Sequence, residues 1–325
     1  MNIILTHKTA LKYYRHFRSN RLNSLDSDLP LMQKLTIPKF FDKNAKEQIE
    51  QTPLNYFDKA YPELLICDKN IANRYSKYAL RYSDLNFPKY SFRKIDDELY
   101  IPIPELLFYQ MSNKLSMPDL LLFGFEMCGT YTLTNDKSDL LTDINAITSS
   151  TKIAQYLNRL YKQNNKFSKI PKAIKASEFI LDNSFSPLES RLAILLCLKR
   201  SLGGFGLEGF VLNQEIALSN EASKICFQKT VTPDLCNMKT KIAIEYDSSL
   251  FHDNVAQNQK DKLRMDAMIH DGWRVFTFVK AHTHNYEAFN QLANDILKAN
   301  NQDIRCSSKR FLARRYELFN HLYNS

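Results

Sequence analysis

The stretch TPDLCNMKTKIAIEYD, residues 232–247, indicates a β-hairpin in the C-terminal half of the chain. Two runs suited to strands flank the polar segment NMKTK, which is the pattern of a hairpin. Because successive strand residues point to opposite faces, Glu245 and Asp247 project to the same side. Asp234 lies on the partner strand, and a turn at NMKTK brings it roughly opposite the end of the second run. The sequence therefore predicts that three carboxylates converge beside one hairpin.

The elements on either side of this hairpin also have clear signatures. Residues 186–202, SPLESRLAILLCLKRSL, supply a serine cap, a proline at the first helical position and Glu189 three residues after the cap. We expect a helix there, ended by the glycine pair at 203–204. A helix over about 256–270 and a strand over 272–279, GWRVFTFV, follow the hairpin. The predicted order is helix, hairpin, helix, strand.

These acids suit a hard divalent cation. Glu245 directly follows the apolar run KIAI, where a carboxylate is costly to bury without a metal or a cation. Mg²⁺ and Mn²⁺ prefer carboxylate oxygens and can activate water for phosphodiester hydrolysis. We expect Asp234 and Glu245 to be the main ligands, with Glu189 completing the shell or bonding the backbone N–H of Ser186 as a helix cap. His252 is a candidate general acid or base, or a phosphate contact.

The segments TPDLC, KIAIEYDSSLFH, DKLR and GWRVFTF, taken in this order, resemble the PD-(D/E)xK nuclease superfamily. More narrowly, they resemble its very-short-patch-repair (Vsr) type and the EDxHD homing endonucleases, over residues 184–282. The resemblance implies a restriction-endonuclease-like fold and a metal-dependent deoxyribonuclease. The positions that match the site of those relatives are Glu189, Asp234, Glu245, His252 and Asp261.

One position departs from the superfamily pattern. Asp247 stands where the motif has a lysine. Either Asp247 serves the metal as a catalytic residue, or Lys260 or His252 supplies the cationic role, or the site is degenerate. The last alternative leaves a non-catalytic DNA-binding or regulatory protein that keeps the nuclease fold.

The charge of the chain favours a polyanionic partner. Its 44 lysine and arginine residues against 35 aspartate and glutamate residues give a formal net charge of +9. Asp261 and Arg264 could also be a simple ion pair one helical turn apart. A basic amphipathic helix at the C-terminus either contacts phosphates or is merely solvated. The candidate nucleic-acid contacts are Lys260, Arg264, Lys309, Arg310, Arg314 and Arg315.

The sequence predicts two domains and an α/β protein of the α+β type. Residues 1–165 are expected to form a mainly helical recognition or partner domain, and 166–183 a connecting segment. Residues 184–325 are expected to form a mixed sheet flanked by helices, with the basic helix at the end. The segment LTHKTALKYYR near the start resembles N-terminal regions of AbiEi-type regulators.

The remaining features limit the class of protein. The six cysteines include no C-x-x-C pair, and no run of 18 apolar residues occurs. We therefore expect a cytoplasmic protein without a membrane span. The leading hypothesis is a DNA endonuclease of a bacterial defence or mobile-element system, with a possible protein partner or homodimer. A module of a toxin and antitoxin pair is a third hypothesis.

Overall fold

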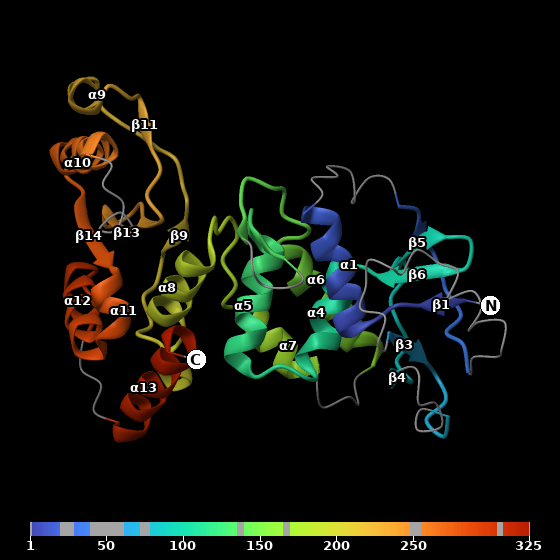
Figure 1. The fold of residues 1–325 in the computed structure, drawn as a ribbon. Coiled ribbons are helices and arrows are strands. Elements are labelled where there is room, and N and C mark those ends of the chain that lie inside the picture. The colour runs from blue at the N-terminus through green and yellow to red at the C-terminus, as the bar shows by residue number, and fades with distance from the viewer. Residues whose placement is uncertain are drawn as a thin grey trace. The chain divides into compact units, whose positions relative to one another are not determined.

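The computed structural model describes residues 2–19, 29–39, 62–71, 79–134, 140–164, 170–247, 255–303 and 308–324, the side chains of 255–258 excepted. The chain divides into two compact units, Met1–Ile180 and Leu181–Ser325. This boundary falls inside the connecting segment predicted over 166–183. The mixture of helices and several small sheets agrees with the α+β type (Figure 1). Among the described helices, none is both long enough and apolar enough to cross a membrane.

The helices of the first unit surround a central apolar helix, α4. Every residue of α4 is buried, and α1, α5, α6 and α7 all pack against it or its neighbours. Serine caps start α5 and α6: Ser116 and Ser149 each accept a hydrogen bond from the backbone N–H three residues on. The helices of this unit are α1 (His7–Ser19), α4 (Pro104–Ser112), α5 (Met117–Cys128), α6 (Ser150–Gln163) and α7 (Ile170–Ser177), and the first four lie within the mainly helical domain predicted over 1–165.

The first unit contains more sheet than the sequence predicted. A four-stranded sheet has the order β1-β6-β5-β2, and β3 pairs with β4 in parallel. Strands of two to five residues carry too few side chains to show a period, which is why they were not predicted one by one. The strands are β1 (Ile3–Ile4), β2 (Leu31–Met32), β3 (Glu63–Ile66), β4 (Ala79–Tyr82), β5 (Phe92–Asp96), β6 (Leu99–Pro102), β7 (Thr132–Leu133) and β8 (Leu140–Leu141).

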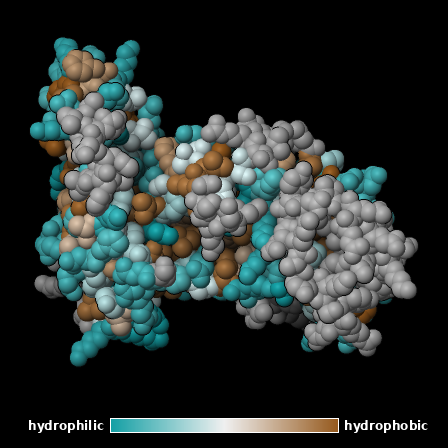
Figure 2. Space-filling model, viewed as in Figure 1, coloured by the Kyte–Doolittle hydropathy of each residue, from teal (hydrophilic) through white to brown (hydrophobic). Residues whose placement is uncertain are grey.

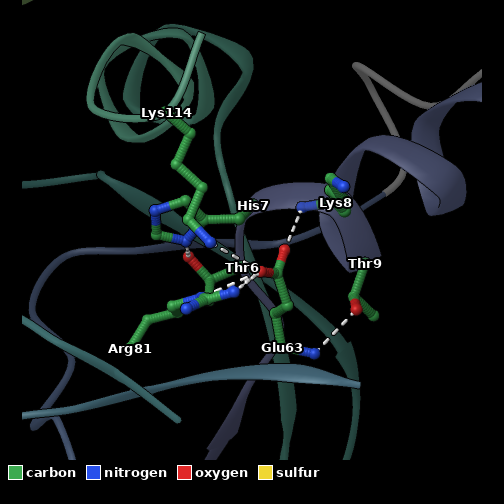
Figure 3. A network of polar contacts seen from close by, with 7 residues as sticks. All are labelled: Thr6, His7, Lys8, Thr9, Glu63, Arg81 and Lys114. Carbon is green, nitrogen blue, oxygen red and sulfur yellow. Dashed lines mark hydrogen bonds and ion pairs between the residues drawn. The ribbon is translucent and has the colours of Figure 1, made fainter. Parts of the chain in front are cut away.

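A buried carboxylate, Glu63 of β3, joins the start of α1 to β4 and to the turn after α4 (Figure 3). Its Oε1 accepts hydrogen bonds from Nε of Arg81 at 2.8 Å and from Nζ of Lys114 at 3.0 Å, and its Oε2 accepts the N–H of Lys8 at 2.6 Å. Burial lowers the pKa of the neighbouring His7 to about 4, so this imidazole is neutral at pH 7. The carboxylate is fully engaged, and we interpret the cluster as a structural link.

The second unit has the predicted order of helix, hairpin, helix and strand. Its main sheet has the order β14-β13-β12-β9, with β13 parallel to β14 and the other pairs antiparallel. The elements are α8 (Pro187–Cys197), η2 (Arg200–Leu202), β9 (Val211–Leu212), β10 (Ile216–Ala217), α9 (Asn220–Cys226), β11 (Thr230–Val231), β12 (Leu235–Asn237), β13 (Ile242–Asp247), α10 (Val255–His270), β14 (Arg274–Val279), α11 (Lys280–His284), α12 (Tyr286–Ala299) and α13 (Lys309–Tyr323).

Helices cover both faces of this sheet. Ala243 of β13 packs with Ala267 and Met268 of α10 on one face. On the other face Phe278 of β14 lies 4.7 Å from Phe289 of α12, measured between ring centres. The side chains of β13 therefore alternate between the α10 face and the α12 face, and Glu245 shares the face of Ala243.

The predicted end of the first helix of this unit is wrong. The helix α8 ends at Cys197, and Leu198 is extended with ψ of 141°. Gly203, with φ of 101°, ends the short helix η2 instead. A Cβ on Gly204 would lie 1.9 Å from the carbonyl oxygen of Leu198. The glycines are needed for this close return of the chain and not for the end of α8.

Candidate functional site

Asp234 and Glu245 lie opposite each other at the open end of the hairpin. Leu235 pairs with Ile244 in the antiparallel register, which places Asp234 one step further on, opposite Glu245. The Oδ2 of Asp234 accepts the N–H of Tyr246 at 2.7 Å. The N–H of Asp234 in turn points to Oε2 of Glu245 at 3.4 Å. The hairpin thus brings together two of the three carboxylates that the sequence predicted to converge.

Glu189 joins this pair through a residue that the sequence did not single out. Its Oε2 accepts hydrogen bonds from Nδ2 of Asn213 at 2.7 Å and from the N–H of Phe185 at 2.8 Å. The N–H of Asn213 donates to the carbonyl oxygen of Asp234 at 3.0 Å, just beyond the paired residues of β9 and β12. The capping prediction is correct in part: Ser186 caps α8 by accepting the N–H of Glu189, but the Glu189 carboxylate bonds Phe185 and not Ser186.

Arg264 of α10 forms an ion pair with Glu245. Its guanidinium Nη2 lies 3.6 Å from Oε1 of Glu245 and donates to the carbonyl oxygen of Thr232 at 3.2 Å. Nη1 of Arg264 pairs with Asp261 at 3.3 Å. The predicted ion pair between Asp261 and Arg264 is confirmed, and the same arginine also reaches the acidic cluster. Arg264, predicted as a nucleic-acid contact, therefore belongs to the site itself.

The electrostatics of the cluster favour protonation. Burial, then the neighbouring charges of Glu245 and Glu189, raise the pKa of Asp234 to about 8. Burial also raises the pKa of Glu245 to about 7, against the opposing influence of Arg264, and Asp261 adds to the increase. Two carboxyl groups that titrate near neutral pH share one site, so an added positive charge would stabilise their ionised forms.

The donor set is chemically suited to a hard cation, but the side chains are not arranged as a finished metal site. Asp234, Glu245 and Glu189 offer carboxylate oxygens, which Mg²⁺ and Mn²⁺ prefer. Among the residues that the structure describes, no three His, Cys, Asp or Glu side chains are grouped so that one ion could bind them all. Binding of a cation would therefore require side-chain rotation.

The other predicted site residues have different positions. Asp247 is the last residue of β13 and is partly buried, two residues beyond Glu245 on the same strand face. Lys260 is exposed on α10. His252 lies outside the described residues, so its proposed role is untested.

The basic C-terminal helix α13 combines exposed and buried positive charges. Lys309 and Arg310 are exposed, and Figure 2 shows mostly hydrophilic side chains over α12 and α13 on the face in view. Arg314 donates to the carbonyl oxygen of Ser201 at 2.7 Å. Arg315 is 3% exposed, and its guanidinium carbon lies 4.0 Å from the ring centre of Phe205. The prediction that Arg315 contacts nucleic acid is therefore wrong, because its side chain packs in the core.

The sequence contained a weak signal for Asn213. Its φ of 48° is in the left-handed region, which asparagine adopts more readily than most residues, and asparagine is typical of such turns. Nothing local indicated that its amide would reach a glutamate 24 residues earlier.

Comparison of the chain with protein-family models, curated proteins and solved structures finds no match.

Proposed function

We propose that the second unit is a metal-dependent endonuclease domain that hydrolyses phosphodiester bonds in DNA. The observation that carries the proposal is the pairing of Asp234 with Glu245 across β12 and β13, with Glu189 brought close by Asn213. Burial and repulsion raise the pKa of both paired carboxyl groups, which is typical of functional sites. The order of strands and helices also supports a restriction-endonuclease-like fold for this unit.

Each residue of the site has a distinct proposed role. Asp234 and Glu245 hold the cation, since they extend from neighbouring strands on one face, and Glu189 adds a third carboxylate. Mg²⁺ or Mn²⁺, when bound, supplies an activated water and neutralises charge on the phosphate. Arg264 lies beside Glu245 and is positioned to contact a phosphate oxygen once the carboxylates engage the cation. Exposed Lys309 and Arg310 extend the proposed DNA contacts, with no base preference.

Cleavage of DNA tests this proposal directly. The full chain is incubated with supercoiled plasmid and with labelled single- and double-stranded oligonucleotides in Mg²⁺, Mn²⁺ or EDTA. We expect cleavage that requires the metal and is abolished in Asp234→Asn and in Glu245→Gln. The matched control is Asp295→Asn, which removes an exposed carboxylate of α12. Cleavage that persists in both site variants would show that Asp234 and Glu245 do not form the catalytic centre.

A second candidate function is DNA binding without cleavage, as in a regulator that keeps the fold. Two observations favour it: Asp247 replaces the motif lysine, and the described side chains are not grouped around one ion position. Salt-sensitive DNA binding with no cleavage in any metal would support this candidate. Both candidates imply a cytoplasmic protein with DNA as partner, in a defence or mobile-element setting.

A further inference from the structure

A cavity of about 320 Å³ lies in the first unit, whereas the acidic cluster belongs to the second. One wall is the segment 32–37, the other is 85–92, and Gln163 at the end of α6 completes the described lining. The volume lies at the lower end of the range of small-molecule pockets, about 300–1,000 Å³. The cavity is therefore large enough for a ligand and too large to be a packing defect.

Hydrogen bonds hold both walls in place, although the walls contain little regular structure. The carbonyl oxygens of Pro30, Thr36 and Pro38 accept bonds from Lys94 N–H, Asn2 Nδ2 and Cys67 N–H at 2.9–3.0 Å. On the other wall, the backbone N–H and carbonyl of Asn86 both bond the side chain of Asn164, at 2.9 and 2.8 Å. A cavity with walls fixed in this way is preformed, which lowers the cost of ordering on binding.

The lining combines three kinds of side chain that suit one class of ligand. The amides of Gln33, Asn86 and Gln163 each offer donors and an acceptor, as the edge of a base requires. Phe87 is partly exposed and lines the cavity with Phe92, and their rings lie 5.4 Å apart between centres in a T-shaped arrangement, so an aromatic ligand would meet aromatic side chains here. Lys34 and Lys89 supply positive charge, and the described lining contains no aspartate or glutamate.

We propose that this cavity binds a nucleotide, with the base between Phe87 and the amides and the phosphate near Lys34 and Lys89. The positive charges of Lys34 and Lys89 disfavour a cationic ligand. A base offers hydrogen-bond partners to the three amides, which a purely aliphatic anion does not. The nucleotide comes either from solution or from an unpaired strand, and both sources present the same base and phosphate.

Binding to the full chain in EDTA tests the proposal without any contribution from metal-dependent cleavage. The probes for isothermal titration calorimetry are the four ribonucleoside monophosphates, adenosine, inorganic phosphate, decanoate and a single-stranded hexanucleotide. We expect at least one nucleotide to bind at least about tenfold more tightly than adenosine, phosphate or decanoate, since base and phosphate contacts add. Equal or tighter binding of decanoate or of phosphate alone would overturn the assignment, as would no binding of any nucleotide.

Variants then locate the site. Lys34→Ala and Lys89→Ala are each expected to weaken nucleotide binding about tenfold, the effect of one charge-assisted contact. Lys152→Ala on the same helix as Gln163 is the matched control, because Lys152 is exposed and does not line the cavity. Asp234→Asn should leave nucleotide binding unchanged, which separates this inference from the proposed nuclease.

Comparing the hexanucleotide with the mononucleotides distinguishes the two possible sources of the nucleotide. If the hexanucleotide binds more tightly than a mononucleotide and the lysine variants weaken it, the cavity takes one nucleotide of an unpaired strand. If mononucleotides alone respond to the lysine variants, the cavity takes a free nucleotide. Binding of every probe with no effect of either lysine variant would contradict the proposed location.

Discussion

Asn213 donates a hydrogen bond from Nδ2 to Oε2 of Glu189 at 2.7 Å, and this bond ties the end of β9 to the first turn of α8. The same amide nitrogen donates to the carbonyl oxygen of Asn183 at 2.8 Å. Asn213, directly after β9, thus holds the Glu189 carboxylate in position beside the site. Its backbone has φ of 48°, so this position favours asparagine or glycine.

Replacement of Asn213 should lower both stability and activity. Asn213→Gly removes two hydrogen bonds, one to a carboxylate, and we expect the free energy of unfolding to fall by about 2 kcal/mol. Asn213→Ala should cost roughly 1 kcal/mol more, because alanine is strained in the left-handed region. Chemical denaturation and plasmid cleavage measure the two effects. Asn301, which has φ of 56° and is exposed, is the matched control: Asn301→Ala should show the backbone cost alone.

The metal-free protein should lose stability as pH rises from 5 to 8. In the folded chain the pKa of Asp234 is about 8 and that of Glu245 about 7, above unfolded values of about 3.9 and 4.3. The folded state therefore binds more protons than the unfolded state between these limits, and its stability falls as each group ionises. Thermal unfolding in EDTA across this pH range measures the slope.

Asp234→Asn should flatten this pH dependence, because the amide cannot ionise and no longer repels Glu245. Asp295→Asn, an exposed change on α12, should leave the slope as it is in the unaltered protein. A free energy of unfolding that stays constant or increases with pH over this range in EDTA would show that ionisation of Asp234 and Glu245 does not destabilise the fold.

Arg264 and a divalent cation should compete for Glu245. Arg264→Gln removes the guanidinium that lies 3.6 Å from Oε1 of Glu245, so the metal-free protein should lose about 1 kcal/mol of stability. Mg²⁺ should then bind about fivefold more tightly, because the opposing charge is gone. Differential scanning fluorimetry with a Mg²⁺ titration measures both quantities. Lys298→Gln, which breaks an exposed pair with Asp295, is the control, and an unchanged Mg²⁺ response in Arg264→Gln would exclude competition.

Glu63 should be essential for the stability of the first unit. Glu63→Gln leaves Arg81 and Lys114 beside each other without their shared counter-ion, and we expect a loss of about 3 kcal/mol. Hydrogen–deuterium exchange should rise in peptides from α1, β3 and β4. Asp97→Asn changes a fully exposed carboxylate of the same unit and should have an effect below about 0.5 kcal/mol.

Lys309 and Arg310 should bind DNA, whereas Arg315 should stabilise the fold. The double change Lys309→Ala with Arg310→Ala is expected to weaken binding to all DNA sequences alike and to lower the salt slope by about 1 for each phosphate that is no longer neutralised. Arg315→Met should instead cost about 2 kcal/mol of stability, since it removes the guanidinium from the ring of Phe205. Fluorescence anisotropy at several salt concentrations measures DNA binding by both variants, and only the double variant should bind more weakly. An unchanged salt slope in the double variant would show that DNA does not contact Lys309 and Arg310.

Local patterns were enough to predict α8, the central hairpin, α10, β14 and α13 of the second unit, whereas α9, α11 and α12 were not predicted. The Ser186 cap, the turn NMKTK and the alternation of KIAIEYD are short-range signals, and each reports how neighbouring residues satisfy their own backbone. The hairpin also predicted that Asp234 and Glu245 would meet, because an antiparallel register follows from the position of its turn. The short strands of the first unit lacked such a signal, since a strand of two residues has no period.

The composition of the site was decided by contacts between residues far apart in the chain. Asn213 reaches Glu189, Arg264 reaches Glu245 and Thr232, and Arg315 lies on Phe205. Helical spacing places Arg315 on the buried face of α13 with Leu318, Phe319 and Leu322, whereas Arg310, five residues before it, is exposed. The capped helix α8, the hairpin and the facing of Asp234 and Glu245 could be predicted from the sequence, because those outcomes depend on neighbours in the chain. The contacts of Arg264 with Glu245 and of Asn213 with Glu189 could not, because pairing between residues far apart in the chain depends on how the elements pack.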